Sequence, residues 1–175
     1  MFDNPVYIFI IVLILGYVAE FILSSKKRKA IKKEHEFFED LLLWPQGSPA
    51  CWQARVKYGQ GTIGVYTEDD GPIKGYREPT ASEEAFCKNT LAKPSELYKR
   101  ALPAIHEAWE SLGNETALPE NWQDEFTLDG FSVPVDCNTS TYWGVSYSSK
   151  SAKHYISIGF HKGVPVLESV DEWEE

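Results

Sequence analysis

Three groups of residues in this chain have types and spacings that could carry chemistry. The first is the segment Gly59-Gln60-Gly61-Thr62-Ile63-Gly64, which satisfies the G-x-G-x-x-G pattern of loops whose backbone amides cradle a phosphate. Such a site needs a helix directly after the glycines, whereas Val65-Tyr66-Thr67 continues a strand pattern. We therefore interpret the segment as a hairpin turn, and a ligand-binding loop remains the alternative.

Histidines and cysteines form the second group. The four histidines are His35, His106, His154 and His161. No pair of them has the spacing of metal ligands, either alone or with a cysteine. Cys137, His154 and Asp136 could act as nucleophile, base and orienting carboxylate if their strands were neighbours, but no serine elbow or pattern of oxyanion donors accompanies them. We expect no metal and no cofactor, and an enzyme using Cys137 and His154 ranks last among three hypotheses.

Carboxylates interspersed with tryptophan form the third group. From Glu34 onward the chain holds 11 basic and 24 acidic residues, a net charge of -13. A body of this charge repels the phosphates of nucleic acids and attracts basic proteins. In such a contact, tryptophan supplies buried area and carboxylates steer the partner. The predicted contact residues are Trp122, Asp124, Glu125, Asp171, Glu172 and Trp173.

An apolar segment lies before these groups and predicts a membrane anchor in residues 1–25. Val6 to Leu23 are 18 residues, which make about 27 Å of helix at ~1.5 Å per residue. A basic cluster follows, and we interpret it as a topology signal that contacts anionic lipid rather than as a nucleic-acid patch. Its members are Lys26, Lys27, Arg28, Lys29, Lys32 and Lys33. This order predicts a single-pass protein of a bacterial plasma (inner) membrane, with its N-terminus outside and its C-terminal domain in the cytosol.

Residues 26–44 predict a basic juxtamembrane helical stem, because their apolar side chains recur at helical spacing. Whether the stripe packs on the domain or on a second copy stays open. Residues 45–175 predict one acidic cytosolic domain. We expect strands at 52–58, 62–67 and 73–77, then helices that begin at the Thr80 and Ser95 caps, with Pro103 kinking or splitting the second.

Four further strands are expected at 126–135, 141–148, 153–160 and 164–170, with Asp129-Gly130 as a tight turn. Strands and helices are therefore segregated along the chain. The predicted fold is α+β: a single transmembrane helix and helical stem, then an antiparallel sheet flanked by two to three helices.

From Trp52 onward the pattern of aromatic strands and paired helices, with Tyr142-Trp143-Gly144-Val145 and Tyr155-Ile156-Ser157-Ile158 in the closing strands, resembles small acidic immunity-type domains found beside bacterial toxins. The resemblance implies a binding module and assigns no functional residue. We therefore predict a non-enzymatic, membrane-anchored module, immunity or regulatory in role, that captures a basic partner at the cytosolic membrane face. The alternative is an accessory structural subunit of an inner-membrane complex, held by its transmembrane helix.

Overall fold

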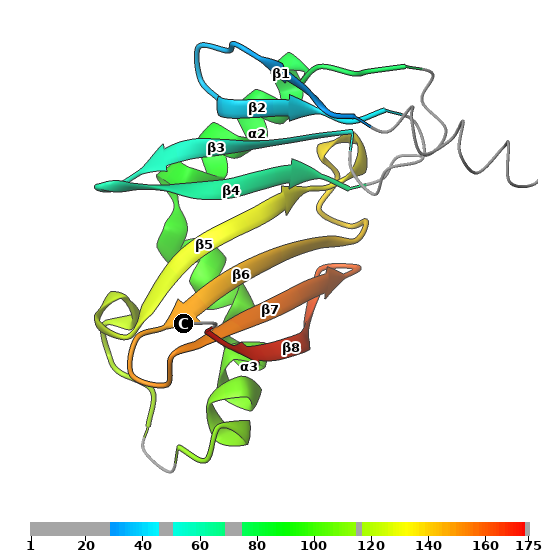
Figure 1. The fold of residues 1–175 in the computed structure, drawn as a ribbon. Helices are drawn as coiled ribbons and strands as arrows, with labels where there is room; N and C mark the ends of the chain where they lie inside the picture. Colours follow the sequence, from blue (N-terminus) through cyan, green and yellow to red (C-terminus); the bar gives the residue numbers. More distant parts are fainter. Residues whose placement is uncertain (1–28, 46–50, 69–74, 115–116, 174–175) are drawn as a thin grey trace, which may run out of the picture.

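The computed structural model describes residues 29–45, 51–68, 75–114 and 117–173. Within these ranges the sheet has eight strands, which lie side by side in chain order (Figure 1). They are β1 (Ile31–Lys33), β2 (Glu39–Leu43), β3 (Trp52–Tyr58), β4 (Gly61–Thr67), β5 (Phe126–Val133), β6 (Trp143–Ser149), β7 (His154–His161) and β8 (Val164–Glu172). Between β4 and β5 run the helices α2 (Ala81–Ala92) and α3 (Pro94–Ser111). The 3-10 helices η1 (Trp122–Asp124) and η2 (Val135–Cys137) have one turn each.

The pairing of β4 with β5 corrects the prediction of an antiparallel sheet. These two strands run parallel, with Gly64 opposite Gly130, while every other neighbouring pair is antiparallel. The physical reason is the connection. The two helices carry the chain back to the end of the sheet at which β4 begins, so β5 starts there and runs in the same direction as β4. The sheet is thus two antiparallel halves of four strands each, joined along one parallel seam.

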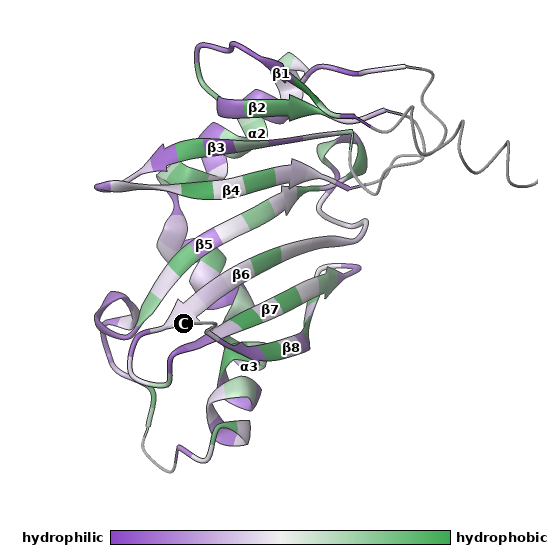
Figure 2. Ribbon diagram, in the orientation of Figure 1, coloured by the Kyte–Doolittle hydropathy of each residue, from purple (hydrophilic) through white to green (hydrophobic). Residues whose placement is uncertain are grey.

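Both helices cover the same face of the sheet, and the core lies between the two layers (Figure 1). Hydrophobic and polar residues alternate along several strands, among them β3 and β7, so one set of their side chains faces the helices (Figure 2). In β3, for example, Trp52, Ala54 and Val56 are buried and the residues between them are exposed. The largest fully buried side chains include Trp52, Trp143, Tyr147, Phe126, Phe131 and Phe160.

The helical stem predicted for residues 26–44 is wrong where the structure describes it. Residues 31–43 form the antiparallel hairpin β1–β2, and β2 pairs with β3. Leu41 and Leu43 are buried at alternate positions, as in a strand, because pairing with β3 outweighs the helical spacing of the apolar residues. Two of the lysines predicted to contact lipid form ion pairs within the domain, Lys32 with Asp40 and Lys33 with Glu78, and their contact with lipid stays a prediction.

The predicted transmembrane helix also needs correction. No helix in the described part of the chain is both long and apolar enough to cross a membrane, so the structure does not support a single-pass membrane fold. Residues 6–23, on which that prediction rests, lie outside the described residues, as do Lys26, Lys27 and Arg28. The accessory-subunit alternative depends on such a helix and therefore gains no support.

Three local predictions are wrong in whole or in part. Asp129 and Gly130 do not form a turn: β5 runs through them, and its register with β6 shifts between Leu128 and Gly130. The residues therefore make a bulge, which bends the strand without ending it. Of the two alternatives for Pro103, the split is wrong, since α3 is continuous from Pro94 to Ser111, and the kink stays a prediction. Of the strand predicted at 73–77, residues 75–77 are not in a strand and the rest lie outside the described ranges.

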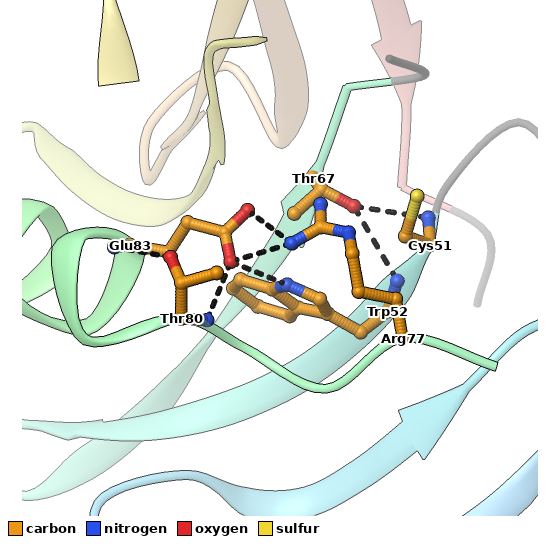
Figure 3. A network of polar contacts seen from close by, with 6 residues as sticks. All are labelled: Cys51, Trp52, Thr67, Arg77, Thr80 and Glu83. Carbon is orange, nitrogen blue, oxygen red and sulfur yellow. Dashed lines mark hydrogen bonds and ion pairs between the residues drawn. The ribbon is translucent and has the colours of Figure 1, made fainter. Parts of the chain in front are cut away.

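One carboxylate fixes the start of α2 against the sheet. Glu83 accepts hydrogen bonds from both the guanidinium of Arg77, at 2.8 and 2.9 Å, and the indole N–H of Trp52, at 3.4 Å (Figure 3). It also accepts from the backbone N–H of Thr80, whose hydroxyl in turn accepts from the Glu83 N–H, which confirms the predicted capping box. Thr67 extends the network by accepting from the N–H groups of residues 51 and 52.

Replacing this carboxylate should destabilise the fold strongly. In Glu83→Ala, the buried Trp52 N–H and the Arg77 guanidinium lose their acceptor, so we expect the free energy of unfolding to fall by about 3 kcal/mol. Urea denaturation followed by tryptophan fluorescence measures this. The matched control is Glu84→Ala on the same helical turn. Glu84 is partly exposed and lies within ion-pair distance of Lys88 and His35, and its loss should cost under about 1 kcal/mol. Equal losses in the two variants would contradict the role given to Glu83.

Candidate binding face

The face of the sheet opposite α2 and α3, here called the open face, has a floor of small side chains. Strand register places them in neighbouring rows across β4 to β7, because directly paired residues point to the same face. They are Gly64, Gly130, Ser132, Gly144, Ser146, Ser157 and Gly159. A shallow hollow of about 220 Å³ lies over this floor, with Tyr66, Asp129 and Glu168 among the side chains that line it.

Two glycines on the floor have close neighbours where a Cβ would stand. A Cβ at Gly130 would lie 2.5 Å from the carbonyl oxygen of Gly64, so the parallel seam closes only with glycine at this position. A Cβ at Gly159 would lie 2.2 Å from a carboxylate oxygen of Glu168 and 3.0 Å from the ring of Tyr142. The absence of a side chain at Gly159 therefore lets these two residues lie flat on the sheet.

Three carboxylates at or beside the hollow have no lysine or arginine partner. They are Glu68, Asp129 and Glu168, and no lysine or arginine of the described residues lies within ion-pair distance of any of them. Burial raises the pKa of Glu68 and of Asp129 above the usual values, and repulsion from Glu168 adds to the rise at Glu68. Glu68 Oε1 and Asp129 Oδ2 are buried and have no hydrogen-bond partner. Ser148 donates a hydrogen bond to Asp129 Oδ1 at 3.1 Å, and a hydrogen bond with Ser132 lowers the pKa of Glu68 in part. These carboxylates are therefore partly stripped of water, and each has a hydroxyl but no lysine or arginine beside it.

Exposed aromatic side chains gather around the same face. Tyr66, Tyr142 and Tyr155 are 42%, 39% and 45% exposed, and Trp173 is 37% exposed. Tyr142 donates a hydrogen bond to both oxygens of Glu168, at 2.9 and 3.2 Å, and Tyr155 lies 6.0 Å from Trp173 between ring centroids. Tyrosine and tryptophan at the surface are the residues that most often anchor protein contacts.

The predicted contact residues before β5 lie elsewhere and have structural partners. Trp122 is buried at 8% exposure and stacks on Tyr98 at 4.9 Å, so its indole belongs to the core. Asp124 accepts a hydrogen bond from Asn121. Glu125 accepts three from Ser149 and Ser151; burial works against its charge, but these bonds outweigh it and lower the pKa of the carboxyl. Glu125 thus holds the turn between β6 and β7.

The predicted contact residues of the tail end β8 and divide between its two faces. Asp171 pairs across the strands with Tyr155, so it lies at the end of the open face, and Trp173 is close to the same tyrosine. Glu172 points to the other side, where its carboxylate lies 3.9 Å from His154. The structure therefore brings two of the six predicted residues to the open face.

The chemistry considered for the cysteines and the glycine segment has no geometric basis here. Cys137 precedes β6, whereas His154 pairs with Ser149 at the far end of that strand, so the two are not brought together. Burial raises the pKa of the Cys137 thiol, which makes it a weaker nucleophile at neutral pH. Gly59 and Gln60 form the hairpin turn between Tyr58 and Gly61, as predicted. No group of three metal-ligating side chains occurs among the described residues.

The residues missed by sequence reasoning are Glu68, Asp129 and Glu168, which come from three different strands or strand ends. Each looks like an ordinary exposed carboxylate in its own segment. The available signal was the alternation of glycine and serine at every second residue of β6 and β7, since small residues repeated on one face leave space above a sheet.

Filling the seam should cost stability. In Gly130→Ala the new methyl group would overlap the Gly64 carbonyl, which is backbone and cannot turn aside, so we expect a loss of about 1–3 kcal/mol in the free energy of unfolding. Gly61→Ala is the matched control, because a Cβ there meets open space. Thermal denaturation of both variants tests this. A Gly130→Ala protein as stable as the control would show that the seam is less tight than the structure indicates.

Removing the charge of Glu68 should stabilise the protein. Because folding raises the pKa of this carboxyl above the ordinary 4.5, the folded state binds protons more tightly than the unfolded state, and stability falls as pH rises through that window. Glu68→Gln should therefore have a higher free energy of unfolding than the parent at pH 7, with the difference vanishing below pH 4.5. Urea titrations across this range measure it. A loss of stability at pH 7 would mean that the charge is compensated.

Comparison with models of protein families, with curated proteins and with solved structures found no match for this chain. The geometry of the open face is therefore the main guide to function. It combines carboxylates that have no lysine or arginine partner, exposed aromatic rings and a hollowed floor in one place.

Proposed function

We propose that this protein is a non-enzymatic binding module that captures a basic protein partner on its open face. The observation that carries the proposal is the gathering of four exposed aromatic side chains around three carboxylates that have no lysine or arginine partner. Capture of this kind would serve an immunity or regulatory role, in which binding itself blocks or controls the partner.

Charge supports a basic partner. From Glu34 onward the net charge is -13, so the field around the domain attracts cations over distances longer than a contact. At the surface, Glu68 and Asp129 have already lost part of their hydration, as the raised pKa values of their carboxyls indicate. A cation that arrives there recovers electrostatic energy without a large new cost of drying the carboxylates.

Rigidity supports a protein partner. The open face is built from β4 to β8, whose backbones are held by neighbouring strands on both sides except at β8. Side chains on such a platform lose little freedom when a partner binds, which favours affinity. At ~4.8 Å between strands, the five strands span about 19 Å, a width that suits an extended segment or a small convex surface.

The proposal predicts that neutralising the open face weakens binding to a basic probe. The variant combines Glu68→Gln, Asp129→Asn and Glu168→Gln, and the probe is a twelve-residue peptide with three lysines and three arginines. We expect the dissociation constant at low salt to rise at least tenfold, because each change removes a negative charge that has no lysine or arginine partner and keeps the shape of the side chain. Isothermal titration calorimetry measures the constant, and amide chemical shifts locate the peptide.

The control neutralises three exposed carboxylates away from the open face, Glu107, Glu110 and Glu120, each changed to glutamine. It alters the net charge by the same amount, so its affinity should stay within about twofold of the parent if position matters more than total charge. Equal weakening in the two variants, or shift changes spread over α3, would reduce the binding to general attraction and overturn the proposal.

A further inference from the structure

At one end of the open face, two carboxylates and two phenols converge. Glu168 lies over Gly159, and both of its carboxylate oxygens accept from the Tyr142 hydroxyl. Register places Tyr66 opposite Ser132. The Oγ of Ser132 accepts a hydrogen bond from the backbone N–H of Gly144 at 2.7 Å, and Gly144 pairs with Gly159. We call Tyr66, Glu68, Tyr142 and Glu168 the acidic–tyrosine cluster.

Electrostatics within the cluster is unfavourable as it stands. Glu68 and Glu168 are near enough to repel each other, and both raise the pKa of the Tyr142 and Tyr66 hydroxyls further than burial alone does. Among the described residues, the basic side chain within ion-pair distance of the cluster is His161, whose Nε2 lies 3.7 Å from Glu168. Glu68 Oε1 remains buried with no donor. An external cation with hydrogen-bond donors would satisfy this oxygen and separate the two negative charges.

The shape of the cluster selects among cations. Its carboxylates come from opposite sides of the floor, Glu68 from the end of β4 and Glu168 from β8, with the two tyrosines standing near them. A guanidinium is planar, carries five donors and stacks on aromatic rings, so it can bridge two carboxylates and contact a ring at once. An ammonium is compact and strongly hydrated, and it would leave one of the carboxylates without a close partner.

We propose that the acidic–tyrosine cluster is the arginine-binding pocket of the open face, so that the partner is recognised by an arginine side chain inserted into the hollow beside Tyr66 and Glu168. This inference rests on the proposed function and names the group that the site selects. The inserted guanidinium donates to Glu68 and Glu168 while its plane lies against the ring of Tyr66 or Tyr142. Asp129 and the aromatic pair of Tyr155 and Trp173 contact the remainder of the partner.

Two peptides of the same length and charge test the inference. Both are twelve residues long with a neutral glycine, serine and threonine background; one carries three arginines and the other three lysines. Calorimetry on the full chain should give a dissociation constant at least tenfold lower for the arginine peptide. In Glu68→Gln and in Glu168→Gln this ratio should fall to about two or less, because a guanidinium then has only one carboxylate to pair with.

Asp171→Asn is the matched control, since it removes one charge from the same face outside the cluster, and it should weaken both peptides equally and keep the ratio. Circular dichroism checks that each variant is folded. Equal affinity for the two peptides, or an arginine preference that survives both cluster variants, would overturn the arginine pocket while leaving the basic-partner function intact. Binding of neither peptide would overturn both.

Discussion

The carboxylate of Glu83 is the interaction on which the arrangement of the two layers depends. It joins the strand that begins at Trp52, the segment that contains Arg77 and the first turn of α2, three parts of the chain that local structure alone would leave independent. Because α2 opens the connection between β4 and β5, its position decides where β5 can enter the sheet. The parallel seam, and with it the floor of the open face, follows from that entry point.

This interaction is strong because the Glu83 carboxylate is buried and because both of its oxygens accept hydrogen bonds. Glu83 is 8% exposed, and its oxygens accept from a guanidinium, an indole and a backbone amide. A buried carboxylate with fewer donors would weaken the fold, whereas one with this many holds its neighbours in a single geometry. The contrast with Glu68 is instructive, since that carboxylate has an oxygen with no donor at all. Glu83 therefore stabilises the fold, whereas Glu68 has an oxygen that can accept a hydrogen bond from a partner.

Sequence patterns predicted those parts of the fold that depend on neighbours in the chain. The capping box at Thr80, the hairpin turn at Gly59 and the alternating strand that begins at Trp52 are all set within a few residues. The failures depend on distant partners. Leu41 and Leu43 lie in a strand because β3 offers an edge to pair with, and Gly130 lies in a strand because β4 pairs with it. Neither partner can be identified from local spacing.

The candidate site was predicted less well than the fold, for the same reason. Acidic residues near tryptophan are visible in sequence, yet Trp122 packs in the core and Glu125 holds a turn, while Asp171 and Trp173 do reach the open face. What distinguishes Glu68 and Glu168 is that no lysine or arginine of the described residues lies within ion-pair distance of them. That property belongs to the assembled surface, and it appears only when strands far apart in the chain are placed side by side.

The parallel seam has a consequence for how the chain acquires its fold. Within each antiparallel half, consecutive strands pair directly, so most contacts there join residues close in sequence. Across the seam, Gly64 meets Gly130, 66 positions further along the chain. Closing so long a loop costs conformational entropy before any contact repays it, and long-range pairings of this kind slow folding. We therefore expect the two halves to acquire structure separately, and their union at β4 and β5 to be the slow, committing step of folding.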